Sequence, residues 1–204
     1  NEPKTKISRV GKFLMLIFML AIISTTNSYA ITLNLANVPL GEDKGFVAPV
    51  GVTTDGTDAY VADYGANTVF KITTSNFAVT PLISVQKPVG VAYYNTKLYV
   101  VTEGSGGKVY NASNGVFTGV TFALDIAKPS DIDVSPAGVI YVSDLSQNNI
   151  KTYDASTGAA ITSCGAAIPI NDNTSTYGNG QFYIIAGLAY DSSTGKLLGA
   201  DSGN

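Results

Sequence analysis

Beyond its N-terminal region the chain alternates short apolar runs with clusters of small polar residues. The runs are rich in Val, Ile, Thr and Tyr, the clusters contain Gly, Asn, Asp and Ser, and no long run there has helical spacing. Clusters such as Asp-Gly and Thr-Ser-Asn are typical of tight turns, because these residues tolerate positive φ or bond their own backbone. The pattern predicts four strands in the first series, at Val50–Thr54, Asp58–Asp63, Thr68–Ile72 and Phe77–Ser84.

The same pattern returns further along the chain. The stretch "YVAD" at 60–63 matches "YVSD" at 141–144, with weaker copies "YVVT" at 99–102 and "LGAD" at 198–201. Each copy follows a strand-like run, and these runs begin at Pro49, Pro88, Pro129 and Ile185. The intervals between these starts are 39, 41 and 56 residues, so the third interval carries an insertion.

A period near 40 residues with four short strands in each unit is the signature of a β-propeller, in which each unit forms one blade. Runs such as "AYVA" at 59–62 and "IYVS" at 140–143 place apolar residues on both faces of a strand. A blade that packs between two neighbours requires this, whereas a sheet with one wet face would alternate more strictly. We therefore predict an all-β chain with about four blades of four antiparallel strands.

The first unit, "PVGVTTDGTDAYVADYGANTVFKI", resembles the NHL and YVTN repeats of exported bacterial β-propellers. Those repeats share a Pro-x-Gly-Val start, a Tyr-Val-Ala-Asp or Tyr-Val-Thr-Asn strand and a Gly-x-Asn turn. The resemblance covers roughly 47–204 and is weaker in the second unit, where Thr102 replaces the Asp, and in the fourth. It implies a propeller that closes with about six blades. We therefore expect this chain, which stops at a turn of the fourth unit, to be the N-terminal part of a longer protein.

The first 30 residues have the three parts of a secretory signal peptide. Four basic residues precede an apolar run at 13–23, and Ala30 ends a cleavage site of small residues. This run is shorter than the roughly 20 residues that a membrane-spanning helix needs. We predict a signal peptide at 1–30, a linker or strand at 31–46 and propeller blades at 47–204. The mature protein is then secreted or periplasmic and has no membrane attachment.

Charge and residue usage narrow the function. Without residues 1–30 the chain has 8 Lys and 14 Asp plus Glu, a net charge of −6, and no basic cluster, so nucleic acid is not an expected partner. The chain has no His, so these residues cannot complete a Ser-His-Asp or Cys-His system. A single cysteine, Cys164, excludes an internal disulfide and is expected to be a small buried side chain.

Several polar residues recur at the same blade position. Asp63, Asp144 and Asp201 end matching strands, and Asn67 and Asn148 lie in the turns that follow. These acids could form a carboxylate ring around a cation, or each could accept hydrogen bonds from backbone N–H groups of its own turn. One acid per blade at a turn favours the structural alternative. The recurring tyrosines at 60, 99 and 141 similarly favour packing between blades over a stacking platform.

Two further acids flank Ile132 in the third unit. Asp131 and Asp133 lie on the first strand of the third blade, which is expected to line the central channel. Gluconolactonase-like propellers hold a divalent cation with channel-facing carboxylates, so the resemblance implies calcium or another divalent cation here. One pair of acids on one strand favours the alternative, which is a solvated channel lining.

The insertion in the third interval supplies the candidate ligand-binding loop. It extends the connection between the third and fourth blades, on the face that also carries the turns after "YVAD" and "YVSD". Binding residues concentrate on loops held by a rigid scaffold. The polar and aromatic residues of this loop are Asn171, Asp172, Asn173, Tyr177 and Gln181. The alternative is an ordinary surface insertion without a binding role, which is the more common use of such a loop.

Two functions follow from these observations. The leading hypothesis is an exported, non-catalytic propeller that binds a protein, peptide or glycan and needs no cofactor. The alternative is a gluconolactonase- or lyase-like enzyme with a divalent cation in the channel. No catalytic residue can be assigned from the sequence.

Overall fold

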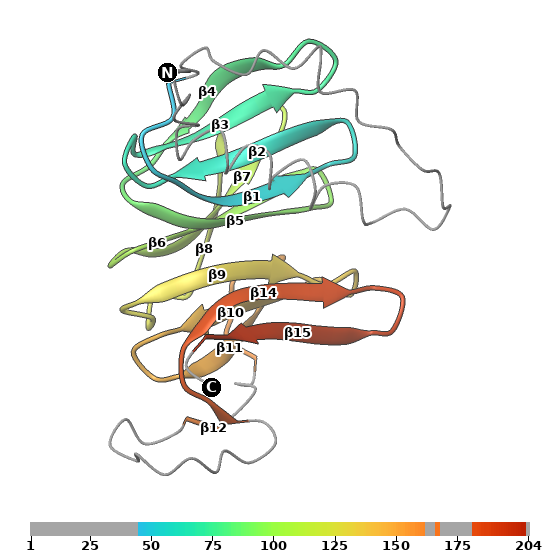
Figure 1. Cartoon of the computed structure of the whole chain (residues 1–204). Helices are drawn as coiled ribbons and strands as arrows, with labels where there is room; N and C mark the ends of the chain where they lie inside the picture. The colour runs from blue at the N-terminus through green and yellow to red at the C-terminus, as the bar shows by residue number, and fades with distance from the viewer. Residues whose placement is uncertain (1–44, 162–165, 168–180, 203–204) are drawn as a thin grey trace, which may run out of the picture.

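The computed structural model describes residues 45–161, 166–167 and 181–202, which form antiparallel sheets arranged side by side (Figure 1). Two sheets have four strands each in the spatial order of the sequence. The first unit consists of β1 (Pro49–Thr54), β2 (Asp58–Asp63), β3 (Thr68–Thr73) and β4 (Ala78–Ser84). The second unit consists of β5 (Pro88–Tyr94), β6 (Lys97–Thr102), β7 (Gly106–Asn111) and β8 (Phe117–Phe122).

The third and fourth units follow the same order with fewer described strands. The third contains β9 (Pro129–Val134), β10 (Val139–Asp144) and β11 (Asn149–Asp154), and the fourth contains β14 (Ile185–Asp191) and β15 (Lys196–Asp201). The expected fourth strand of the third unit is represented by one antiparallel bridge between Tyr153 and Ala160. Two-residue strands β12 (Ala166–Ala167) and β13 (Gln181–Phe182) pair in parallel, which the repeat did not predict.

The all-β prediction is confirmed, and the strands predicted for the first unit agree with β1–β4 to within one residue at each end. The prediction and the structure differ at Phe77, which the sequence pattern includes in the fourth strand. Its φ is +56°, a left-handed conformation that turns the chain between β3 and β4, so the strand begins one residue later. An aromatic residue rarely adopts this conformation, so nothing in the sequence indicated it.

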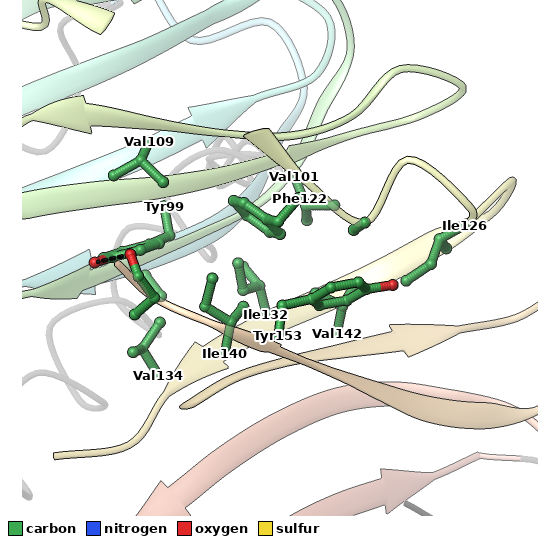
Figure 2. Packing of buried hydrophobic residues seen from close by; sticks show 13 residues of the cluster. Tyr99, Val101, Val109, Phe122, Ile126, Ile132, Val134, Ile140, Val142 and Tyr153 are labelled. Carbon is green, nitrogen blue, oxygen red and sulfur yellow. Dashed lines mark hydrogen bonds between the residues drawn. The ribbon is translucent and has the colours of Figure 1, made fainter. Parts of the chain in front are cut away.

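Apolar packing between successive sheets forms the core. On β6 the side chains alternate: Leu98 and Val100 join the cluster shared with the first unit, whereas Tyr99 and Val101 join the cluster shared with the third. Figure 2 shows the second of these clusters. All four side chains are buried, and each contributes roughly 1.5–3 kcal/mol relative to an exposed side chain. Burial on both faces is what the apolar runs predicted.

The recurring tyrosines lie at the seams between units. The Tyr60 ring stacks on Tyr93 at 6.2 Å, and the Tyr99 hydroxyl donates to the Ala155 carbonyl at 3.2 Å. Tyr141 stacks on Tyr190 at 5.8 Å. Each tyrosine therefore contacts the unit that follows its own, which is a packing role.

The first strands of successive units, β1, β5, β9 and β14, lie next to one another. Glycine permits the close approach: a Cβ on Gly51 would lie 3.2 Å from Gly90 Cα, and one on Gly90 would lie 2.9 Å from Ile132 Cγ2. The connections that precede these four strands and the turns that follow β2, β6, β10 and β15 lie at the same end of the sheets. We call this end the loop face.

Gly158→Ala should lower the melting temperature more than Gly195→Ala. Both residues have positive φ, +75° and +69°, in similar turns, so both variants incur backbone strain of about 1–2 kcal/mol. A Cβ on Gly158 would also lie 1.9 Å from the carbonyl oxygen of Thr121 in the second unit, whereas the nearest atom to one on Gly195 is 3.9 Å away. Thermal unfolding of the two variants measures the difference. Equal losses would show that the Gly158 turn does not pack against the second unit.

Candidate functional site

The carboxylate of Asp63 joins the turn after β2 to the segment that enters β1. Its Oδ2 accepts from Val47 N at 2.7 Å, and its Oδ1 accepts from Ala48 N at 2.8 Å and from Ala66 N at 2.9 Å. The side chain is fully buried. Only one of the three donors lies in the expected turn; the other two lie 15 and 16 residues upstream.

Asp201 and Asp144 occupy the matching positions of the fourth and third units. Asp201 accepts from Tyr183 N and Ile184 N, each at 3.0 Å. Asp144 differs, because its Oδ1 accepts from the N–H (2.8 Å) and hydroxyl of Ser146, while its Oδ2 is buried and has no hydrogen-bond donor among the residues that the structure describes. The nearest cation to that oxygen is Lys151 Nζ at 3.7 Å.

Asn67 and Asn148 both have left-handed backbone, with φ of +53° and +49°. The Oδ1 of Asn67 accepts from Lys87 N at 2.9 Å, which ties the turn of the first unit to the segment entering the second. In the second unit Thr102 replaces Asp and donates its hydroxyl to the Gly106 carbonyl at 2.8 Å. Asn67 and Thr102 therefore contact backbone groups of turns and connections on the loop face.

Asp131 and Asp133 connect the edges of β9 and β14. In each carboxylate, Oδ1 accepts a hydrogen bond from an amide of its own strand, and Oδ2 accepts one from an amide of the next unit. The donors to Asp131 are Ile132 N (2.9 Å) and Leu188 N (2.8 Å), and those to Asp133 are Val134 N (2.7 Å) and Tyr190 N (2.6 Å). The sequence pattern placed both acids on this strand but gave no indication of these partners.

Aligning the first strands of the units shows what these acids replace. The Asp131 position is Gly51, Gly90 or Gly187 elsewhere, and the Asp133 position is Thr53, Ala92 or Ala189. The Thr53 hydroxyl accepts from Tyr93 N at 3.1 Å, the same relation to the following unit that Asp133 has to Tyr190. The sequence did carry one signal for this contact. Acids stand in the third unit where the other units have small residues.

The seam between the third and fourth units is consequently polar. The Ser130 and Ser143 hydroxyls lie 2.7 Å apart, and Ser130 also donates to the Ile185 carbonyl at 2.5 Å. Burial raises the pKa of Asp131 to about 6, with a smaller contribution from Asp133, and burial also raises the pKa of Asp133. Within the described residues, no group of three His, Cys, Asp or Glu side chains is arranged to hold a metal ion.

A second cluster on the loop face joins the first and second units. The Tyr64 hydroxyl donates to Glu103 Oε2 at 2.5 Å, and Lys87 Nζ lies 3.4 Å from the same oxygen and 5.7 Å from the centre of the Tyr64 ring. The Tyr64 hydrogen bond and Lys87 lower the pKa of Glu103. Sequence reasoning missed this cluster, because its members come from three different connections.

The predicted ligand-binding loop falls largely outside the described residues. Asn171, Asp172, Asn173 and Tyr177 belong to the 168–180 segment. Gln181 begins β13, and its side chain is not among those described.

No known sequence family matches the chain, and no curated protein matches it in sequence. Solved structures do match in fold. The hydrazine synthase of Kuenenia stuttgartiensis aligns with 83% of this chain at 17% identity and a TM-score of 0.58, and the glutaminyl cyclase of Myxococcus xanthus aligns with 74% at 16% and 0.54. A chain from a nidogen/laminin complex aligns with 76% at 17% and 0.56.

The fold is that of a β-propeller. At this level of identity the likeness concerns the fold alone. The alignments cover 46%, 66% and 57% of those three chains, respectively, so this chain spans between about half and two thirds of their length. The units described above are its blades.

Asp63→Ala should destabilise the protein more than Asp144→Ala. The first variant leaves three backbone N–H groups without their acceptor, which costs about 1–3 kcal/mol of unfolding free energy when such groups are buried. The second leaves one backbone N–H group and one hydroxyl. Urea denaturation of both variants measures the order. A larger loss for Asp144→Ala would contradict the contacts assigned to Asp63.

Asp131→Asn should gain stability relative to the wild type as pH rises. The folded pKa of Asp131, about 6, exceeds the ordinary value of 3.8, so the acid contributes its full stability below about pH 4 and loses it as pH rises through 6. Because Asn does not ionise, the difference in unfolding free energy should shift toward the variant by on the order of 2 kcal/mol between pH 4 and pH 7.

Asp154→Asn provides the control with the opposite sign. Hydrogen bonds from Ser156 and Thr157 lower the pKa of Asp154 to about 2, so its contribution is present above pH 4 and is lost as pH falls toward 2. Unfolding curves at several pH values compare both variants with the wild type. A constant difference for Asp131→Asn would sink the assignment of a buried acid at this seam.

Proposed function

We propose that this chain is part of an exported β-propeller that binds a protein, peptide or glycan on its loop face without catalysing a reaction. The observation that carries the proposal is a set of exposed aliphatic side chains in the connections on that face. Val47, Leu124 and Ile184 are 68%, 72% and 40% exposed, and each lies in the connection that precedes the first strand of a blade. Exposed apolar residues beside polar groups are typical of recognition surfaces.

Polar groups for recognition lie on the same face. Tyr64, Lys87 and Glu103 present an aromatic ring, an ammonium group and a carboxylate between the first two blades. Tyr is enriched in interfaces because it combines apolar area with a hydrogen-bonding group. The insertion before β14 belongs to the same set of connections, so we propose that Asn171, Tyr177 and their neighbours contribute to binding.

The resemblance to NHL and YVTN repeats and the signal-peptide pattern of residues 1–30 support an exported, secreted or periplasmic protein. No helix in the described part of the chain has the length and apolar character needed to cross a bilayer. These features agree with the proposal.

The alternative is a gluconolactonase- or lyase-like enzyme, and the acids that break the repeat favour it. Asp131 and Asp133 lie on the same face of β9, on either side of Ile132, as a cation site in the channel would require. Each of their four carboxylate oxygens, however, accepts a hydrogen bond from a backbone amide. This use of the acids supports an architectural role, and we therefore rank binding first. Calorimetric titration with calcium tests the alternative directly.

Leu124→Asp should weaken binding to the strongest hit of a glycan and peptide array by about ten-fold or more, because it places a charge among the exposed aliphatic side chains of the proposed surface. Val116→Asp is the matched control, since Val116 is 55% exposed in the turn between β7 and β8, away from the loop face. Both variants should keep the wild-type melting temperature. Equal binding by both variants, or turnover of a lactone by the wild type, would reject the proposal.

A further inference from the structure

Side chains anchor the segment that enters the first strand in three of the four blades. The amides of Val47 and Ala48 donate to Asp63 before β1, and those of Tyr183 and Ile184 donate to Asp201 before β14. Before β5, where the matching acid is replaced by Thr102, the amide of Lys87 donates to Asn67 instead. This anchor is therefore a regular feature of the fold.

A backbone hydrogen bond lies beside this place in all four blades, including the third, which lacks the side-chain anchor. The residue after the strand-ending Asp or Thr donates its N–H to the carbonyl of the residue just before the first strand. The four pairs are Tyr64 to Ala48, Glu103 to Lys87, Leu145 to Lys128 and Ser202 to Ile184, with distances between 2.8 and 3.1 Å. These contacts define equivalent positions, so Ala127 and Lys128 in the third blade match Val47 and Ala48 in the first.

The third blade leaves both halves of its anchor unused. The amides of Ala127 and Lys128 donate to no acceptor within the described residues, and both residues are exposed. The Oδ2 of Asp144, the acceptor at the matching position, is buried without a donor. A buried acceptor that lacks a donor costs stability, because it has lost its hydrogen bonds to water.

A different anchor holds this connection. Lys151 Nζ donates to the carboxylate of Asp125 at 2.8 Å and to its carbonyl at 3.1 Å, and the Tyr153 hydroxyl donates to the other carboxylate oxygen at 2.7 Å. Lys151 also lies 3.7 Å from Asp144 Oδ2, so its charge offsets part of the cost of burying that carboxylate. One lysine therefore stabilises both the observed position of the connection and the unpaired acid.

We propose that residues 123–128 form a strap on the loop face with two alternative anchors. In the observed state Asp125 is bound by Lys151 and Tyr153. In the second state the amides of Ala127 and Lys128 bind Asp144, as the corresponding amides bind Asp63 and Asp201. Leu124, the most exposed aliphatic residue of the loop face, moves with the strap, so the two states present different surfaces.

Removing the lysine charge should shift the strap to its second anchor. In Lys151→Met the Asp125 contact loses its cation, and Asp144 needs a new donor, which the Ala127 and Lys128 amides can supply. Hydrogen exchange of the full chain, followed residue by residue by NMR, should show the Lys128 amide exchanging about ten-fold more slowly than in the wild type. Lys108→Met is the matched control, because Lys108 occupies the same strand position in the second blade and should leave this amide unchanged.

Two results would overturn the proposal. One is unchanged exchange at Lys128 in a Lys151→Met protein that melts cooperatively. The other is slower exchange that persists in Lys151→Met/Asp144→Ala, since that variant has no second anchor. If Lys151→Met does not fold, Lys151→Leu removes both the charge and the donor near Asp144 with a shorter side chain, and the same amide is measured with the same expected slowing.

Discussion

The structure depends on one constraint: each inner sheet has a neighbour on both of its faces. Every strand in the middle of a sheet must therefore be apolar at successive positions, which is why β6 sends Leu98 and Val100 to one side and Tyr99 and Val101 to the other. Polar residues are displaced to the turns and connections. The separation of an apolar scaffold from a polar loop face follows from this packing, as does the repetition of the sequence.

The seams are not chemically equivalent. Those between the first three blades are packed mainly by apolar side chains, with glycines where the first strands meet. The seam between the third and fourth blades uses Asp131, Asp133, Ser130 and Ser143 instead. A hydrogen bond between protein groups replaces one to water, so such a seam gains less from contact than an apolar one does. The polar seam instead fixes how the two blades align, because each carboxylate must reach particular amides.

Sequence reasoning located the strands because each depends on local information, namely Pro-led starts, apolar runs and Gly, Asn or Asp turns. It missed the conformation of Phe77, which no residue preference indicates. The partners of Asp131 and Asp133 could not be derived, since Leu188 and Tyr190 lie 57 residues away and their position depends on how two blades align. The link from Asp63 to Val47 was missed for the same reason. The ligand loop and the signal peptide remain predictions.

The polar seam also bears on how such a chain can change in evolution. Blades joined by apolar faces and glycine contacts can be duplicated or exchanged, because each surface fits any neighbour of the same kind. The third blade carries two carboxylates that need a neighbouring strand set at a distance where amides can reach them. The blade that follows must therefore supply hydrogen-bond donors at these places as well as a surface of the right shape. The third blade therefore restricts which blade can follow it, whereas the first two blades carry no such restriction.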